Sequence, residues 1–254
     1  MADTDMQNET LRTLRAHRSI RTFTDEPIPD ADVIEAVRAG QAAATSSAVQ
    51  AYSLIRVRDR AKRERLAELT GPQDKVALAP AFFAICGDAR RHRLLCERAG
   101  GAYDQRLEAF MVATIDATLF AQNLVVAFES MGYGTCYIGG LRTRIAEVDE
   151  LLNLPEHVYP LYGLCVGKPA EAPSLRPRLP VEAVLFEEGY PSDDAMLGPV
   201  DQYDAEYRAY LASRAGGPGA KAPSPWGERM GHKYQTPERT HLAEYYKAKG
   251  ARLD

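Results

Sequence analysis

Two groups of basic side chains have the composition of an anion-binding site. The first is His17-Arg18-Ser19-Ile20-Arg21, in which three potential cations and a serine surround one apolar residue. The second is Arg176-Pro177-Arg178, where prolines keep the chain extended and fix where the two guanidinium groups point. Arginine binds a phosphate monoester through forked, charge-assisted hydrogen bonds. Each group alone is also compatible with a solvated surface or with ion pairs.

Two further stretches are rich in small residues. Thr45-Ser46-Ser47 follows a predicted helix, and small hydroxylated residues there suit ligand contact as well as a plain loop. Tyr137-Ile138-Gly139-Gly140 ends a short apolar strand and precedes another helical pattern. Backbone at such a place can approach a flat or anionic ligand closely, although a tight strand-to-helix turn would have the same sequence. With the two basic groups, these stretches suggest a planar ligand with a phosphate at one end.

The sequence lacks the motifs of self-sufficient catalytic sites. It has no G-x-G-x-x-G after a strand, no P-loop, no G-x-S-x-G and no H-E-x-x-H. The five histidines do not cluster and the four cysteines show no C-x-x-C spacing. We therefore expect reduced thiols, no disulfide frame and no metal site. Such a chain is either a binding protein or an enzyme whose cofactor supplies the chemistry.

The composition is that of an ordinary globular protein. The chain has 254 residues, of which 45% are hydrophobic and 26% charged, and a formal net charge of −4. This balance lacks the basic excess of a nucleic-acid-binding surface. The first residues, Met1 to Gln7, are polar and acidic and do not resemble a signal peptide. We expect a cytoplasmic protein without nucleic-acid or membrane partners.

A long apolar stretch from Leu107 to Met131 is the element around which the sites must be organised. It is apolar on nearly every face, which predicts a helix buried on every face, and its alanines let other elements or a second subunit approach closely. A membrane span of about 20 residues is the alternative. Asp116, Gln122 and Asn123 argue against a span because polar groups are costly in lipid.

Apolar runs and helical patterns alternate along the rest of the chain. Strands are predicted at 53–57, 81–86, 135–138 and 160–167, and helices at 9–16, from an N-cap at Asp30, at 61–69, at 201–214 and from Thr236 to about Lys249. Polar residues 90–105 are expected to form a surface excursion, and residues 215–225 a mobile loop. This order predicts an α+β fold with a mixed central β-sheet covered by helices.

Taken in order, the motifs resemble those of the FMN-dependent nitroreductase superfamily, most closely the oxygen-insensitive NADPH nitroreductases of the NfsA/Frp group. The matching stretches are His17-Arg18-Ser19-Ile20-Arg21-x-Phe23-x-x-Glu26-Pro27-Ile28, Ala44–Ser47, Thr70-Gly71-x-Gln73, Tyr137–Arg142, Leu164-Cys165-x-Gly167-x-Pro169 and Pro177–Pro180. Each motif alone is weak, but their shared order is a strong signal. The resemblance covers the chain from about Leu11 to Gly250.

The resemblance implies a nitroreductase-like fold in an intertwined homodimer, with one FMN in each of two active sites at the interface. It implies an FMN-binding core at 1–180, and a C-terminal excursion and helices at 181–254 that complete the dimer and the NADPH site. No side chain need be catalytic, because the flavin carries the chemistry. The residues implied to lie near the ribityl phosphate are His17, Arg18, Ser19, Arg176 and Arg178.

The resemblance also implies contacts for the flavin ring and for the nucleotide. Arg21 would face the N1/O2 edge and support the reduced flavin, and Gln73 would face the pyrimidine edge. The ring would be lined by the backbone of Tyr137, Ile138, Gly139 and Gly140, and by Thr45, Ser46 and Ser47, the serines coming from the other subunit. NADPH would be bound by Arg214, Lys221 and Arg239, although a solvated loop with scattered cations is the alternative.

The function implied is an FMN-dependent oxidoreductase. It would use NADPH to reduce nitro compounds, quinones, flavins or similar acceptors by ping-pong hydride transfer. The alternative is a flavin-binding or redox-sensing protein on the same fold without rapid turnover. The family often has an aromatic residue directly after the serines, where this chain has Ala48, so the shape of the substrate pocket stays open.

Overall fold

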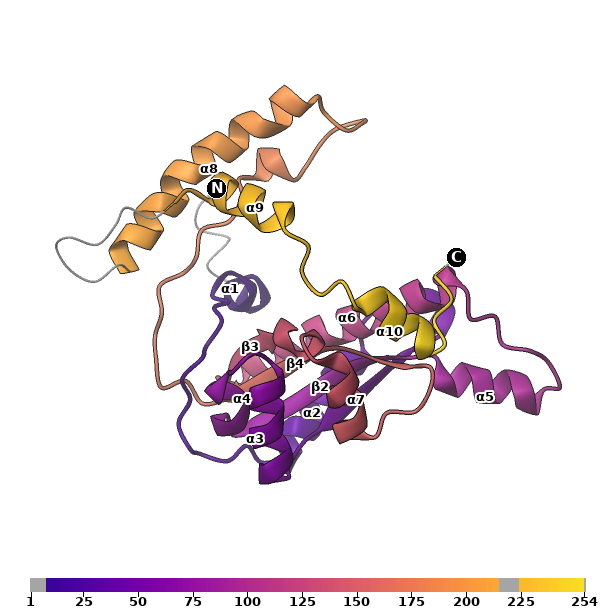
Figure 1. The fold of residues 1–254 in the computed structure, drawn as a ribbon. Helices are drawn as coiled ribbons and strands as arrows, with labels where there is room; N and C mark the ends of the chain where they lie inside the picture. The colour runs from indigo at the N-terminus through magenta and orange to yellow at the C-terminus, as the bar shows by residue number, and fades with distance from the viewer. Residues whose placement is uncertain (1–7, 215–223, 254) are drawn as a thin grey trace. The chain divides into compact units, whose positions relative to one another are not determined.

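Two compact units make up the chain. The computed structural model describes residues 8–214 and 224–253. One unit is Met1–Pro173 together with Arg239–Asp254, and the other is Ser174–Glu238. Figure 1 follows the chain from indigo at the N-terminus to yellow at the C-terminus. Lys221 and most of the loop expected at 215–225 lie outside the described residues.

The first unit is built on a four-stranded sheet. Its strands are β1 (Tyr52–Arg56), β2 (Ala81–Asp88), β3 (Gly134–Ile138) and β4 (Val158–Gly167), in the order β1-β2-β4-β3. Every neighbouring pair is antiparallel. The α+β class is therefore confirmed, but these strands form an antiparallel sheet and not the expected mixed one. The helices between β2 and β3 do join strands of the same direction, but β4 inserts between those strands and runs against both.

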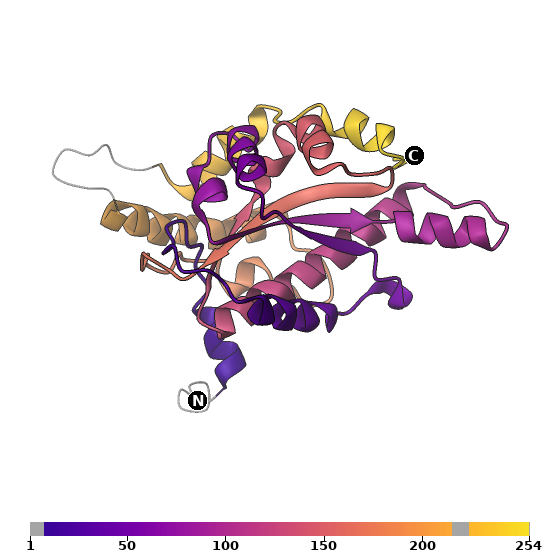
Figure 2. The same cartoon turned by 90° about the horizontal axis from the view of Figure 1, so that it is seen from below.

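Helices cover both faces of this sheet. α2 (Asp30–Gln41) and α6 (Leu107–Ser130) lie on one face, and α3 (Arg60–Leu69), α4 (Asp74–Leu78) and α7 (Ile145–Leu152) lie on the other (Figure 2). Phe83 and Ile85 of β2 pack with α2 and α6, whereas Phe82 and Ala84 pack with α3 and α7. All of β2 is buried, as expected for a central strand between helical layers. The unit also contains α1 (Glu9–Arg15), α5 (Arg90–Arg98), α10 (Leu242–Ala248) and the 3₁₀ turns η1 (Ser46–Ala48) and η2 (Gly139–Arg142).

Short polar side chains fix several helix ends. Asn8 caps α1 by accepting a hydrogen bond from the Leu11 amide, and Asp59 caps α3 by accepting one from the Lys62 amide. α7 ends at Asn153, which adopts the left-handed conformation. Asp30 is not the N-cap that we expected. It is the first residue of α2, and its carboxylate pairs with Arg56 and Arg58 at 2.6 and 2.7 Å, so ion pairing prevails over the local capping preference.

α6 is the long apolar helix expected from the sequence, but one chain does not bury it on every face. Its buried side packs against the sheet and α2 and includes Asp116, Phe120 and Leu124. The other side exposes an apolar stripe whose side chains are 41–50% accessible, namely Leu107, Met111, Ile115 and Leu119. By length and composition alone α6 could cross a membrane, which is weak evidence because core helices pass the same test. Its packing here is that of a core helix.

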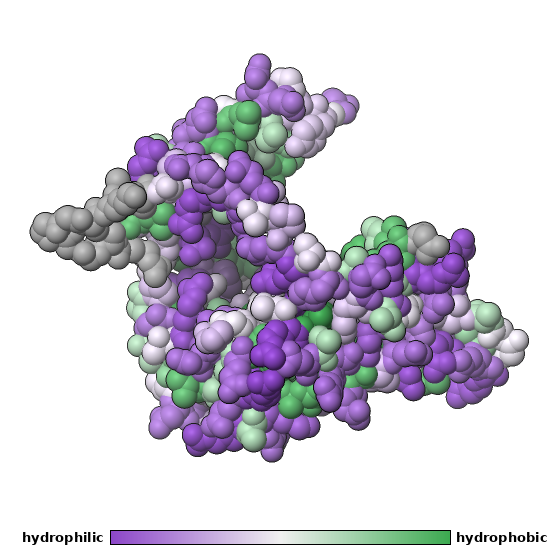
Figure 3. All heavy atoms as spheres, in the orientation of Figure 1, coloured by the Kyte–Doolittle hydropathy of each residue, from purple (hydrophilic) through white to green (hydrophobic). Residues whose placement is uncertain are grey.

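The second unit is helical in the part that the structure describes. It contains η3 (Val181–Ala183), α8 (Asp193–Arg214) and α9 (Trp226–Gln235). α8 begins earlier than expected, and α9 was not expected. Tyr203 and Tyr207 of α8 are buried, and the Tyr203 ring meets the Trp226 ring edge-on at 5.7 Å. Hydrophobic side chains also stay at its surface (Figure 3), including Leu175, Val181, Val184, Leu185 and Leu197.

The other departures from expectation are helix positions. Residues 90–105, expected as a surface excursion, begin with α5. The final helix starts after His241, and Thr236 instead ends α9 in an extended conformation. Thr236-Pro237-Glu238 has the composition of a helix start, so the local pattern was misleading there.

Candidate functional site

The basic segment, residues 17–21, is anchored to β3. Ser19 forms a parallel bridge with Thr135, and the Ile20 amide donates to the Thr135 carbonyl at 2.9 Å. Ile20 is buried against Gly134, where an added Cβ would lie only 2.6 Å from its side chain. Because side chains alternate along extended backbone, burying Ile20 directs Ser19 and Arg21 away from the core. One buried residue thus sets the direction of its polar neighbours.

The histidine of the basic segment is held by a carboxylate that we did not single out from the sequence. His17 Nδ1 lies 2.7 Å from Oε1 of Glu129, which also accepts a hydrogen bond from the Thr135 hydroxyl at 2.9 Å. Glu129 stands near the end of α6, so the histidine is tied to both α6 and β3. A carboxylate inside an otherwise apolar helix was the available signal for such a role.

The two arginines of the basic segment keep their charge uncompensated. The Arg18 guanidinium donates to the Ala16 and Pro173 carbonyls, and the Arg21 guanidinium to the Ser19 carbonyl. Within residues 8–214 and 224–253 neither makes an ion pair. Glu171 is nearby, but its carboxylate accepts from the backbone amides of Arg21 and Thr22. Arg18 also lines a pocket of about 540 Å³ with Tyr133 and Glu171. One half-buried and one exposed guanidinium group, both bonded to backbone carbonyls, are suited to bind an anion.

Gln73 packs against Gly140 of the glycine pair. A Cβ added to Gly140 would lie 2.1 Å from the Thr70 carbonyl oxygen and 2.4 Å from Gln73 Nε2. The turn at 70–73 therefore packs directly on this backbone, which only glycine allows. Gln73 Nε2 donates to the Thr70 carbonyl at 2.6 Å, so the amide side chain has a fixed direction. An amide edge and closely approachable backbone thus lie at the end of β3.

The other two residues of the glycine motif have different surroundings. Tyr137 is 37% exposed, and its ring meets the Tyr162 ring edge-on at 5.3 Å. Ile138 is buried in the layer formed with α3 and α7, so any contact that it makes to a ligand must come from its backbone. β3 therefore carries Ser19 beside its start and the tyrosine and the glycines at its end.

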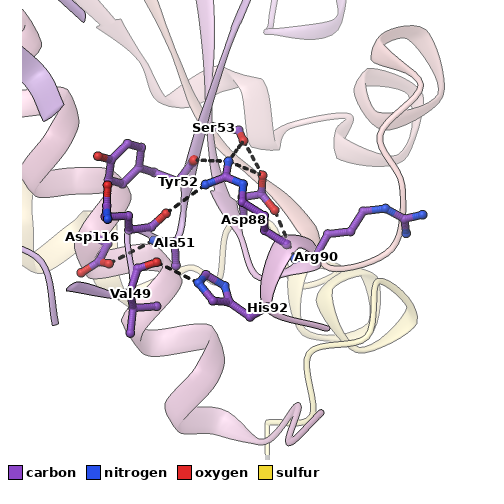
Figure 4. A network of polar contacts seen from close by, with 10 residues as sticks. Val49, Ala51, Tyr52, Ser53, Asp88, Arg90, His92 and Asp116 are labelled. Carbon is purple, nitrogen blue, oxygen red and sulfur yellow. Dashed lines mark hydrogen bonds and ion pairs between the residues drawn. The ribbon is translucent and has the colours of Figure 1, made fainter. Parts of the chain in front are cut away.

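The serine loop, residues 45–50, is held by a different part of the unit. Asp116 of α6 accepts hydrogen bonds from the amides of Ser46 and Ala51, at 3.0 and 3.1 Å. His92 of α5 lies 2.8 Å from the Val49 carbonyl (Figure 4). The hydrogen bonds of this loop thus run to α5 and α6, whereas those of the basic segment run to β3 and Glu171. Asp116 was noted in the sequence as evidence against a membrane span and not as a site residue.

Arg176 and Arg178 belong to the second unit. With Tyr203, Trp226 and Arg229 they line a pocket of about 500 Å³. Arg178 donates to the Arg176 carbonyl at 3.1 Å, and the Arg176 guanidinium lies 6.0 Å from the centre of the Tyr210 ring. The segment has no regular secondary structure, as its prolines predicted. Three arginines and two aromatic rings form a pocket suited to an anion.

The residues expected to bind a nucleotide are separated by the division into units. Arg214 is the last residue of α8 in the second unit. Arg239 belongs to the first unit, where it adopts a left-handed backbone conformation before α10. The expectation for these residues and for Lys221 stays a prediction.

The three buried cysteines, Cys86, Cys136 and Cys165, are unsuited to nucleophilic chemistry. Burial raises the pKa of the Cys86 thiol to about 12 and raises the pKa values of Cys136 and Cys165 as well. A thiol of this kind is protonated at neutral pH and is a poor nucleophile. The geometry is therefore that of a binding site whose chemistry is carried by its ligand.

Comparison with known proteins gives matches along the whole chain. The model of the nitroreductase family matches residues 14–168, and that of the nitroreductase family C-terminal domain matches residues 176–254. An FMN reductase (NADPH) of Bacillus subtilis is 41% identical over 247 residues, covering 96% of this chain and 98% of the relative. An oxygen-insensitive NADPH nitroreductase of Salmonella typhimurium is 45% identical over 199 residues, covering 78% and 82%. The solved structure of NfrA1 from B. megaterium superposes with a TM-score of 0.92 at 40% identity, covering 96% and 99%.

Proposed function

The chain belongs to the nitroreductase family, and from this premise we propose that it is an FMN-dependent oxidoreductase that takes electrons from NADPH. Its acceptors are small molecules such as nitro compounds, quinones and flavins. The observation that carries the proposal is that Arg18 and Arg21 make no ion pair with any described residue and belong to the segment that pairs with β3, the strand leading to Gly139 and Gly140. Relatives that reduce FMN or nitro compounds support the same reading.

The residues present fit FMN. Its phosphate needs cations without carboxylate partners, its ring needs closely approachable backbone, and its pyrimidine edge needs an amide. Arg18 supplies the first, Gly140 the second and Gln73 the third. The full set of proposed cofactor-binding residues is His17, Arg18, Ser19, Arg21, Thr45, Ser46, Ser47, Gln73, Tyr137, Ile138, Gly139, Gly140, Arg176 and Arg178.

The protein's part in the reaction is binding, orientation and charge. Bound FMN supplies hydride transfer between NADPH and the acceptor. An arginine side chain is a fixed cation, so Arg21 would stabilise negative charge on the cofactor without taking part in proton transfer. The packed turn at Gln73 and Gly140 offers a fixed surface against which a flat ligand would lie. If donor and acceptor bound there in turn, the kinetics would be ping-pong.

The functional unit that we propose is a homodimer. The apolar stripe of α6 runs along three turns and is exposed in the single chain, a pattern typical of an interaction surface. A second copy placing the same stripe against it would form a self-complementary interface of the kind common in two-fold dimers. Obligate interfaces of this kind bury more than about 2,000 Å². In this dimer Ser46 and Ser47 serve the partner's flavin.

The remaining parts of the proposal concern the nucleotide, the domains and the compartment. Arg214, Lys221 and Arg239 are proposed to bind the 2′-phosphate of NADPH. Residues 1–180 are proposed as the FMN-binding core, and residues 181–254 as the part that completes the dimer and the nucleotide site. Reduced thiols are consistent with a cytoplasmic enzyme.

The decisive experiment is anaerobic mixing of the purified yellow protein with NADPH. The expected result is bleaching of the flavin absorbance near its visible maximum, followed by recovery of colour when a nitro compound or quinone is added. Bound flavin that NADPH leaves unbleached would instead identify a flavin-binding or redox-sensing protein. Failure to retain FMN would contradict both functions.

A further inference from the structure

The serine loop has an unusual backbone. Ser47, Ala48 and Gln50 all adopt left-handed conformations, with φ of 47°, 59° and 54°. Residues with a Cβ rarely take up this conformation, because the side chain crowds the carbonyl oxygen. Three such residues within four positions persist only where the surroundings determine the backbone. The loop therefore needs an external constraint.

Asp116 supplies a constraint at both ends of the loop. One carboxylate oxygen accepts from the Ser46 amide at 3.0 Å and the other from the Ala51 amide at 3.1 Å. These two amides enclose the three left-handed residues. Figure 4 shows Asp116 beside Ala51, with the His92 ring contacting the Val49 carbonyl from α5. The carboxylate thus joins the ends of the strained segment and fixes them on α6.

Among the described residues, the Asp116 carboxylate accepts hydrogen bonds only from the two loop amides. Asp116 is 0% exposed, and among the described residues it makes no ion pair. A buried carboxylate is costly unless its oxygens accept hydrogen bonds, so it is compensated here by the loop alone. Charge-assisted bonds to backbone amides are stronger than neutral ones, which suits a group that must hold a strained backbone.

We propose that Asp116 is the positioning residue of the serine loop, holding the backbone that presents Ser46 and Ser47 to the flavin. This role rests on the proposed function and adds to it the residue that positions the loop. Asp116 follows Ile115 of the exposed stripe directly in the sequence. The loop is therefore fixed to the same helix that carries the dimer surface, and it reaches the partner's cofactor in a defined geometry.

The test uses Asp116→Asn in the full-length protein, with Asp149→Asn as the matched control. Asp149 is another largely buried carboxylate, which binds Lys249 and the Tyr245 hydroxyl at 3.0 and 2.9 Å and does not contact the loop. The asparagine at 116 keeps one acceptor and faces the other amide with an NH₂ group. Two quantities are measured, namely hydrogen exchange of the Ser46 and Ala51 amides in the apoprotein, and the Kd for FMN.

Asp116→Asn should speed exchange at both amides and raise the Kd for FMN about ten- to a hundredfold, the range for losing one charge-assisted hydrogen bond. Asp149→Asn should change neither, even where it lowers Tm. Unchanged exchange in Asp116→Asn would overturn the constraint, and faster exchange with an unchanged Kd would overturn the role in flavin binding. A parent protein that binds no FMN would instead contradict the proposed function, while the exchange result would still decide whether Asp116 holds the loop.

A second pair of variants covers the case in which Asp116→Asn does not fold. Ala48 is exposed and left-handed, so Ala48→Val strains the loop without disturbing the core, and Ala48→Gly relieves strain at the same position. Valine should weaken FMN binding and glycine should not. Equal Kd values for the two variants would mean that loop geometry does not matter to the flavin and would overturn the proposal.

Discussion

In the first unit the candidate arginines stand on a sheet with a buried core, whereas in the second they stand on a proline-flanked segment beside two helices. The first unit buries whole strands and three hydrophobic clusters. Among its described residues, the second unit buries only the aromatic rings of Tyr203 and Tyr207 and leaves several large apolar side chains exposed. One unit carries its own core, and the other has little core of its own.

The two units therefore hold their candidate arginines in different ways. The backbone of residues 19–21 is held by pairing with β3 and by the buried Ile20, so the cost of ordering it is met when the protein folds. Arg176 and Arg178 make contacts to local carbonyl groups and a ring, so part of their ordering falls on the binding step. If both units bind one flavin as proposed, the first would define where the ligand lies and the second would add affinity.

The largest expected effect concerns the exposed stripe of the first unit. Ile115→Glu places a charge in the apolar interface, next to its symmetry-related copy, where like charges are strongly unfavourable. Sedimentation at micromolar concentration should show a dimer for the parent and for Ile115→Leu, and a monomer for Ile115→Glu. A dimer in all three proteins would show that this stripe is not the interface. The buried core of the first unit would then be complete without a partner.

The second expected effect concerns the contribution of the second unit to FMN binding. Arg178→Ala removes a charge-assisted contact worth about 1.5–3 kcal/mol, so the Kd for FMN should rise about ten- to a hundredfold. Arg208→Ala, which removes an exposed arginine of α8 outside the pocket, should retain FMN like the parent during dialysis. Equal retention by both variants would restrict phosphate binding to the first unit.

The third prediction concerns the rigidity of the first unit and is measured as a change in the free energy of unfolding. Gly140→Ala forces a Cβ against the Thr70 carbonyl, which should lower the free energy of unfolding of the apoprotein by about 1–3 kcal/mol. Gly139→Ala is the control, because its nearest new neighbour would be Arg142 Nη2 at 3.7 Å. In urea titrations, the unfolding midpoint of Gly140→Ala should lie well below that of Gly139→Ala. Equal midpoints would show that the packed turn yields easily and that the contrast in rigidity is overstated.

The narrowest expected effect is confined to one substrate. If Arg214 binds the 2′-phosphate, Arg214→Ala should raise the KM for NADPH about ten- to a hundredfold while leaving FMN content and the KM for NADH nearly unchanged. Stopped-flow flavin reduction with each nucleotide measures this. Equal losses with both nucleotides would mean that Arg214 supports the end of α8 and does not bind the phosphate. If neither nucleotide shows a loss, Arg214 does not bind the phosphate, and any preference for NADPH over NADH must come from Lys221 or Arg239.

The contrast between the units also explains what the sequence predicted well. The runs at 81–86 and 160–167 were identified as strands because they are buried on both faces, so the local pattern and the tertiary packing agree. α9 was missed because Trp226–Gln235 contains two glycines, which disfavour a helix, and follows a stretch rich in glycine and proline. Its position depends instead on tertiary contacts such as that between Trp226 and Tyr203.

The candidate site divides in the same way. The basic segment and the Gln73 turn could be proposed as site residues from the sequence because their residue types and order carry the signal. Asp116 and Glu129 could not, because each acts on residues that are distant in the sequence: 70 positions separate Asp116 from Ser46, and 112 separate Glu129 from His17. A lone carboxylate in an apolar helix indicates that it must have a partner, but the partner is known only once the chain is folded.

α6 carries two consecutive residues with different assignments: Ile115 on the exposed stripe and Asp116 beneath the serine loop. Subunit association and loop geometry therefore act through one turn of helix. If both assignments hold, a substitution on the exposed stripe that separates the subunits would also deprive each flavin site of the partner's serines. Separated chains would then lose flavin even where each stays folded.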